Sequence, residues 1–324
     1  MFTGQQQVRV IKKLEVEEVE KGQVSKFFLH IISDGMGLPV YVPIMVARGV
    51  QDGPILGLTA AVHGNELNGV SVIQRLFRDI DPLALRGTIV GVPVVNIPGF
   101  LQMQRPFNDG NDLNRIMPGR EDGNSAEVYA HRLVTKILYQ FDYLIDLHTA
   151  SFGRINSYYV RANLNDPDVY ELAQIQNAQI LLHSPAPDAT VRGNLTEYGV
   201  KSLTLEVGDP NRFQRGLIRS GLVGLHNTII QLGMEDGQIE NPEQKPIVCD
   251  HSYWIFSKKG GILQVLPEVT ELVSKGQVIA IIRNIFGEVI QEIEAPEDGV
   301  VIGKHVQPVA QTGTRILHLG IIKN

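Results

Sequence analysis

The segment ILGLTAAVHGNELNG (55–69) sets the fold class, because an aliphatic run passes directly into a polar turn and then into a helical pattern. Three further aliphatic runs have the same character and also end in polar or turn residues: TIVGVPVV (88–95), YLIDL (143–147) and SLTLEV (202–207). Continuous apolar runs of this kind are typical of strands that are buried on both faces. With helical stretches between them, they predict an α/β fold whose mostly parallel or mixed sheet is flanked by helices.

The regions around this core predict the domain organisation. Residues 1–50 alternate in the manner of strands, so we expect a β-rich opening within a catalytic α/β domain that spans 1–232. The polar, Pro- and Gly-containing segment 233–247 is typical of a linker. Residues 248–324 contain short strand patterns and no evident helix, which predicts a small all-β domain.

One helix has a particularly clear beginning. Asn124 precedes Glu127 by three residues, which is the spacing of a capping box, and a helical pattern continues to about Gln140. Four apolar positions in this stretch form a stripe suited to face the core: Val128, Leu133, Ile137 and Leu138.

The composition argues against several classes of protein. A formal charge of −6 without a long Lys/Arg run argues against a nucleic-acid or membrane partner. The 324 residues are 43% apolar, which is enough for a core, yet no segment approaches the roughly 18 uninterrupted apolar residues of a membrane helix. The single cysteine, Cys249, cannot form an intramolecular disulfide, and MFTGQQQVRV does not resemble a signal peptide. We therefore expect a cytoplasmic protein.

Metal-binding residue types follow two of the predicted strands. His63 and Glu66 come directly after the strand at 55–62, and His148 comes directly after the strand at 143–147. Open α/β sheets place ligands at the carboxyl ends of their strands, so these side chains are expected to meet. Two histidines and one glutamate with an open fourth position form a known catalytic zinc set. The alternative is that each histidine is a hydrogen-bonded core residue or a helix cap, and we assign that role to the others: His30, His131, His183, His226, His251, His305 and His318.

Candidates for acid–base chemistry and anion binding lie elsewhere in the same region. Glu206 ends the run at 202–207, where a carboxylate is costly unless it is used in catalysis or paired with an arginine. The loop-like segment RPFNDGNDLNRIMPGR contains Arg105, Arg115 and Arg120. Guanidinium groups suit the capture of a carboxylate and can face a scissile carbonyl, although a solvated basic loop would have the same composition.

Four short motifs follow one another in a characteristic order: HGNE (63–66), DGNDLNR (109–115), DLHT (146–149) and LEVG (205–208). Together they resemble the succinylglutamate desuccinylase/aspartoacylase family, a branch of the zinc carboxypeptidase-like hydrolases. The resemblance covers roughly 54–232 strongly and the remainder more loosely. Each motif alone is unspecific, but four in order with matching strand context are a specific signal.

The resemblance implies a role for each matching residue. It implies one Zn²⁺ per chain, held by His63, Glu66 and His148, and it makes Glu206 the general base and acid. Substrate contacts are also implied, because Asn114 and Arg115 match the pair that grips the substrate carboxylate and Arg105 looks like the arginine that polarises the carbonyl. Asp146 is either an orienting partner of a zinc ligand or a structural aspartate.

The activity implied by this resemblance is hydrolysis of the amide bond of an N-acyl amino acid by zinc-activated water, with Glu206 as base. Two alternatives stay open, namely a zinc carboxypeptidase acting on short peptides and a non-catalytic module that binds a carboxylate. A serine hydrolase is disfavoured because the sequence has no G-x-S-x-G motif. Succinyl-glutamate, acetyl-aspartate and acetyl-diaminobutyrate types of substrate all fit the arginine argument.

The C-terminal segment resembles the barrel-sandwich shape of biotinyl and lipoyl domains, through ELVSKGQVIAII (271–282) and EAPEDGVVIG (294–303). The stretch between them, RNIFGEVIQEI, has no lysine to carry a swinging cofactor, and Lys275 and Lys304 lie outside it. A carrier role is therefore not expected. A lid beside the zinc site, or a surface for homo-oligomer formation, is the preferred interpretation.

Overall fold

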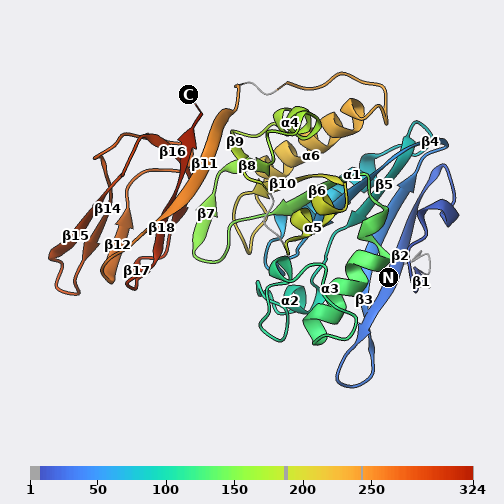
Figure 1. The fold of residues 1–324 in the computed structure, drawn as a ribbon, viewed down its shortest axis with the longest axis horizontal. Coiled ribbons are helices and arrows are strands. Elements are labelled where there is room, and N and C mark those ends of the chain that lie inside the picture. Colours follow the sequence, from blue (N-terminus) through green and yellow to red (C-terminus); the bar gives the residue numbers. More distant parts are fainter. Residues whose placement is uncertain (1–7, 186–188, 242–243, 324) are drawn as a thin grey trace, which may run out of the picture.

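One long mixed sheet organises the chain in the computed structural model, which describes residues 8–185, 189–241 and 244–323 (Figure 1). Its strands lie in the order β1 (Arg9–Ile11), β2 (Gln23–Ser33), β3 (Pro39–Arg48), β5 (Arg86–Val92), β4 (Gln51–Ala60), β6 (Tyr143–His148), β10 (Lys201–Val207), β8 (Tyr158–Ala162), β9 (Ile180–His183), β11 (Ile247–Phe256), β18 (Arg315–Ile322), β16 (Gly299–His305) and β13 (Leu272–Val273). The short strand β7 (Arg154–Asn156) pairs with β16 outside this path.

The four aliphatic runs of the sequence form the centre of this sheet. β5, β4, β6 and β10 are parallel to one another, whereas β3 and β8 are antiparallel to their central neighbours. The predicted mixed sheet is therefore confirmed. Because β4, β6 and β10 run in the same direction, the residues that follow them emerge at one edge, and Glu206 pairs in register with His148.

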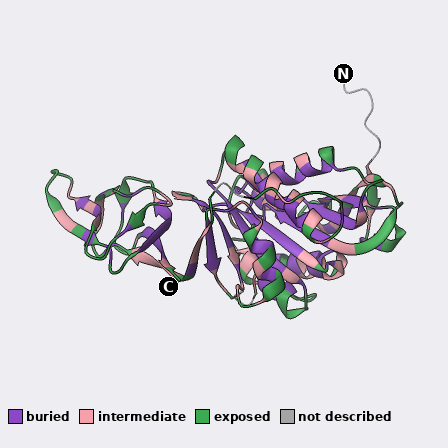
Figure 2. Cartoon of the chain, turned by 90° about the horizontal axis from the view of Figure 1, so that it is seen from above, coloured by how far each residue is buried: buried purple, intermediate pink, exposed green. Residues whose placement is uncertain are grey.

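Helices cover both faces of the sheet. The buried side chains of α1 (Asn68–Asp79), α4 (Pro167–Gln174) and α6 (Arg215–Gln231) belong to one hydrophobic cluster. Those of α3 (Ser125–Lys136) and α5 (Val191–Glu197) belong to a second cluster with β2 and β3. Figure 2 shows the buried residues concentrated along the strands between these helices. No helix in the described ranges is long and apolar enough to cross a membrane.

The helix predicted from Asn124 is present with its capping box, but α3 ends at Lys136 rather than near Gln140, and Val128 of the predicted stripe is only partly buried. The side chain of Asn124 accepts from the backbone N–H of Glu127 at 3.0 Å, and the carboxylate of Glu127 accepts from the N–H of Asn124 at 2.9 Å. The shorter elements are α2 (Ile97–Leu101) and the 3₁₀ turns η1 (Val16–Glu18), η2 (Leu113–Arg115) and η3 (Leu138–Gln140).

The C-terminal region is β-rich, as expected. Its strands divide between two sheets. β11, β18, β16 and β13 continue the main sheet, and a separate antiparallel sheet has the order β15 (Val289–Glu294), β14 (Val278–Arg283), β12 (Gly261–Val265), β17 (Val309–Ala310). This small sheet lies at the opposite end of the molecule from β1 (Figure 1). The boundary at 233–247 stays a prediction.

Candidate metal centre and substrate pocket

The turn that carries His63 and Glu66 is fixed by close packing against α2. β4 ends at Ala60, and Ala61 has a φ of 49°, a left-handed conformation that is uncommon for residues other than glycine. A Cβ atom on Gly64 would lie 2.0 Å from the carbonyl carbon of Gly99, so a side chain does not fit there. The glycine of the HGNE motif therefore lets the turn approach the α2 backbone.

We expect Gly64→Ala to displace this turn and to lower both stability and metal binding. Overpacking of a tight site typically costs about 1–3 kcal/mol, and the contact here is with backbone atoms that cannot rotate away. Urea unfolding and the metal content of the purified protein measure the two effects. Gly35→Ala is the matched control because no atom lies within 4 Å of the added Cβ. Wild-type stability and metal content in Gly64→Ala would contradict this account of the turn.

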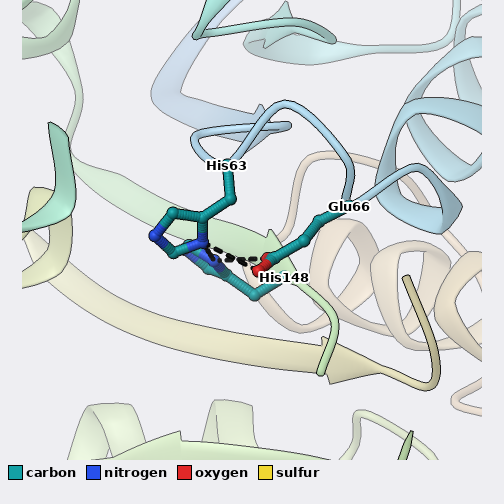
Figure 3. Close-up of side chains that lie close together, drawn as sticks. All are labelled: His63, Glu66 and His148. Carbon is teal, nitrogen blue, oxygen red and sulfur yellow. Dashed lines mark hydrogen bonds and ion pairs between the residues drawn. The ribbon is translucent and has the colours of Figure 1, made fainter. Parts of the chain in front are cut away.

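The three predicted ligands converge at the edge of the sheet (Figure 3). Nδ1 of His63 lies 2.9 Å from Glu66 Oε1, and Nδ1 of His148 lies 3.0 Å from Glu66 Oε2. The two Nδ1 atoms are 3.2 Å apart, and one donor atom from each of the three buried residues lies within 4.8 Å of the others. His148, which is 82 and 85 positions from the other two residues in the sequence, thus joins them in presenting two nitrogens and a carboxylate oxygen to one point.

Carboxylates hold the outer nitrogens of both imidazoles. Asp112 Oδ1 lies 3.0 Å from Nε2 of His63, and Asp146 Oδ2 lies 2.8 Å from Nε2 of His148. Asp146 is itself fixed, because its Oδ1 accepts from the Thr59 hydroxyl at 2.6 Å. A carboxylate on Nε2 favours the proton there and leaves the lone pair of Nδ1 directed at the common point. Asp146 thus lies where an orienting partner is needed, and Asp112, which the sequence did not suggest, has the same position on the other ring.

The charge state of Glu66 suits a cation ligand. Burial alone would raise the pKa of its carboxyl group, but the imidazoles of His63 and His148 outweigh burial and hold the pKa well below its usual range. The site therefore offers an ionised carboxylate together with two nitrogen donors. That donor chemistry fits Zn²⁺, which binds histidine and carboxylate ligands with one position left open in catalytic sites.

Glu206 lies beside the three donors at the end of β10. It is buried, and its Oε2 accepts a hydrogen bond from Asn156 Nδ2 at 3.2 Å. Its register partner on β8 is the buried Tyr159. Burial raises the pKa of Glu206, while the neighbouring imidazole of His148 acts in the opposite direction. Among the described residues, no arginine or lysine forms an ion pair with Glu206. The buried ion pair that the sequence left open as an alternative is therefore not observed.

The arginines predicted in the loop before α3 have different environments. Arg105 donates to Glu66 Oε1 at 3.1 Å and to Asp112 Oδ2 at 3.0 Å, which places it beside the metal donors. Asn114 and Arg115 line the same pocket, and Arg115 is largely exposed at 71% of its side chain. Arg120 is instead paired with Glu127 at 3.0 Å and does not line the pocket.

The three metal donors, Glu206, Asp112 and the loop residues Arg105, Asn114 and Arg115 surround a cavity of about 210 Å³, and the sequence did not indicate the other residues of its wall. The additional residues include five arginine, tryptophan and histidine side chains of later elements and one arginine that follows His148: Arg161, Arg192, Trp254, Arg315, His318 and Arg154. His318 is a buried, hydrogen-bonded histidine, as expected, but it also lines the pocket. Arg154 follows His148 by six residues, so its position shortly after a predicted strand could have indicated it. The other five residues have no local motif that indicates a pocket.

Comparisons with known proteins extend this description. A family model described as the succinylglutamate desuccinylase/aspartoacylase catalytic domain matches residues 52–232. The chain is 23% identical over 291 residues to the N-alpha-acetyl-L-2,4-diaminobutyric acid deacetylase of Halomonas elongata. This alignment covers 86% of this chain and 84% of that protein.

Solved structures share the fold over nearly the whole chain. A succinylglutamate desuccinylase/aspartoacylase from Rhodobacter sphaeroides has a TM-score of 0.86 at 22% identity and covers 97% of this chain and 99% of its own. The product-bound ectoine utilization protein from Ruegeria pomeroyi has a TM-score of 0.85 at 22% identity and covers 94% and 96%. These likenesses include the C-terminal strands, which lie outside the range of the family model.

Proposed function

Because the chain belongs to the succinylglutamate desuccinylase/aspartoacylase family, we propose that it is a zinc-dependent amidohydrolase that cleaves the amide bond of an N-acyl amino acid. The observation that carries this proposal is the convergence of His63, Glu66 and His148 beside a second buried carboxylate, Glu206. The deacetylase of Halomonas elongata supports the substrate class, since its name describes an N-acetyl amino acid as substrate.

His63, Glu66 and His148 would hold the zinc ion, which when bound lowers the pKa of water and polarises a carbonyl group. Glu206 takes a proton from the attacking water as the new C–O bond forms. It then delivers that proton to the amide nitrogen as the C–N bond breaks, so that a carboxylic acid and an amine leave. A buried carboxyl group whose pKa is raised is suited to both transfers near neutral pH.

Arg105 is placed to stabilise negative charge that develops on the carbonyl oxygen. Its hydrogen bonds to Glu66, Ser151 and Asp112 use three N–H groups of a guanidinium that has five. The remaining donors are available to an oxygen beside the metal donors. Asn114 and Arg115 would hold the substrate carboxylate, which fixes the amide above the metal site.

The test is a hydrolysis assay of zinc-loaded protein on acetyl, succinyl and formyl derivatives of amino acids, with short peptides as a parallel panel. We expect turnover of at least one N-acyl amino acid and little on peptides. Faster release of C-terminal residues from peptides would favour a carboxypeptidase. A protein that retains no zinc and gains no activity when zinc is added would favour the non-catalytic binding module.

A further inference from the structure

Asn156 connects the carboxylate of Glu206 to the C-terminal strands. It is the last residue of β7 and lines the same cavity as Glu206. Its Nδ2 donates to Glu206 Oε2 at 3.2 Å. A neutral amide can fix the direction of a carboxylate while binding it less strongly than an arginine would, so the carboxylate stays free to take up a proton.

The position of Asn156 is set by β16, which lies far later in the chain. In the antiparallel ladder of β7 and β16, Asn156 lies opposite Gly303. The next residue, Ser157, donates both its backbone N–H, at 2.9 Å, and its hydroxyl, at 3.0 Å, to the carbonyl oxygen of Ile302. The ladder and these two hydrogen bonds together hold the backbone of Asn156 against β16.

The carbonyl group of Ile302 belongs to a bulge in β16. On its other side, β16 pairs with β18 up to Val301 and again from Gly303, so Ile302 is the extra residue. Bulges interrupt a ladder locally and redirect groups beside functional sites. This one lies directly opposite the end of β7, where the amide that contacts Glu206 is attached.

Gly303 leaves the space that the amide of Asn156 occupies. A Cβ atom on this glycine would lie 2.4 Å from Asn156 Oδ1 and 2.9 Å from the carbonyl oxygen of Ile155. Oδ1 thus packs against the backbone of β16, while Nδ2 of the same planar amide donates to Glu206. The direction of the donor is therefore fixed by the fit between this side chain and a glycine of the C-terminal region.

We propose that Asn156 is a positioning residue for the general base. Its amide, held by β16, keeps the carboxylate of Glu206 in the orientation in which it takes a proton from the attacking water and passes it to the leaving nitrogen. The inference rests on the proposed function, in which Glu206 is the base. It gives the C-terminal strands a part in proton transfer, which is distinct from a lid and from a surface for oligomer formation.

The first test is the steady-state kinetics of Asn156→Ala on the best N-acyl amino acid. We expect kcat to fall by about 10- to 100-fold, the range expected for one hydrogen bond to a charged group, and KM to change by less than about threefold. Asn156→Asp keeps the shape of the side chain without the donor, so it should lose at least as much turnover. Asn165→Ala, which removes an exposed asparagine outside the pocket, should retain the wild-type kcat. A raised KM with unchanged kcat would mean that Asn156 binds the substrate, and would overturn the inference.

A double-mutant cycle shows whether Asn156 acts through Glu206. In a Glu206→Gln background there is no base to orient, so Asn156→Ala should lower the residual turnover by less than about twofold. If the losses of the two single variants multiply instead, Asn156 acts independently of Glu206 and the inference is wrong.

The role of β16 is tested by Gly303→Ala, whose added Cβ displaces the amide without removing it. We expect its kcat to fall as in Asn156→Ala, and the two changes together to be no worse than either alone. Gly299→Ala is the matched control, because its Cβ would lie 2.6 Å from the carbonyl oxygen of Gly320 and overpacks the same strand away from Asn156. It should lower stability and leave kcat unchanged. A wild-type kcat in Gly303→Ala would overturn the role of the strand.

Crystal structures of the zinc-loaded wild type and of Asn156→Ala give an answer that does not depend on activity. We expect the carboxylate of Glu206 to move by more than about 1 Å, or to adopt several conformers, when the amide is removed. An unmoved, ordered carboxylate would refute the positioning role. If the wild type hydrolyses no N-acyl amino acid, the proposed function fails while this comparison still decides the inference. If the wild type is active and Asn156→Ala is equally active, the inference fails and the proposed function stands.

Discussion

Glu206→Gln should lower turnover by about 10²- to 10⁴-fold and leave the bound zinc in place, because an amide can neither accept nor deliver the proton in transit. Oε2 of Glu206 is bonded to Asn156 and lies outside the group formed by His63, Glu66 and His148, so metal content should not change. Turnover on the best N-acyl amino acid and zinc content by mass spectrometry measure the two quantities.

The stability of the same variant separates a catalytic role from a structural one. Burial raises the pKa of Glu206 in the folded protein above its value in the unfolded chain, so the fold disfavours the ionised form. Any stability that this carboxyl group contributes is present at low pH and is lost as the pH rises through its folded-state pKa. At pH 7 the neutral amide should therefore leave the free energy of unfolding unchanged or raise it.

The matched control for this substitution is Glu197→Gln on the exposed surface of α5, which should retain wild-type turnover. If Glu206→Gln hydrolyses the substrate at near-normal rates, the base must be sought elsewhere in the pocket. If it loses activity together with zinc or stability, Glu206 supports the site structurally.

Loss of a metal ligand should lower turnover by a factor similar to that expected for Glu206→Gln. It should also remove the stabilisation of the fold that zinc provides. We expect His63→Ala to abolish measurable hydrolysis and to lose stoichiometric zinc. Asp112 still has Arg105 at 3.0 Å after this change, so the loop need not unfold. In the wild type, zinc at 100 times its Kd should add about 2.7 kcal/mol to the free energy of unfolding, and this increment should be absent in the variant.

Thermal unfolding with zinc and after treatment with a chelator measures that increment. His251 lies on β11 and is exposed, so the structural role expected for it from the sequence was wrong. His251→Ala should therefore behave as the wild type in every respect. The proposed ligand set would be contradicted if His63→Ala still bound one zinc per chain. It would also be contradicted if added zinc left the melting temperature of the wild type unchanged.

The parts of the fold and site that could be predicted from the sequence are those encoded locally. The runs at 55–62, 143–147 and 202–207 are continuous and aliphatic, so the strands and their common edge followed from burial alone. His63, Glu66 and His148 were found because each lies directly after such a run. The capping box at Asn124 was equally local, since it depends on two residues three positions apart.

Features that depend on the path of the chain through space were not accessible in this way. Trp254 and Arg315 approach the pocket only because β11 and β18 continue the main sheet, and no pattern near either residue indicates that continuation. Arg161 and Arg192 lie on the antiparallel β8 and on α5, where nothing in the local sequence indicates a pocket. Arg120 was a candidate because it lies in a basic loop. In the structure it forms an ion pair with Glu127 in the first turn of α3 instead.

The pairing of β7 with β16 has a consequence for the order of events during synthesis. Arg154 lies on β7, which follows β6 closely in the sequence, yet its pairing partner is His305 on β16, about 150 residues further along the chain. During translation, the proposed zinc ligands are therefore synthesised long before β16, the strand that pairs with β7 at the wall of the pocket. We expect a ribosome-bound chain that ends before β16 to bind metal although one wall of its pocket has not yet formed. Substrate selectivity is then established only after the metal is bound.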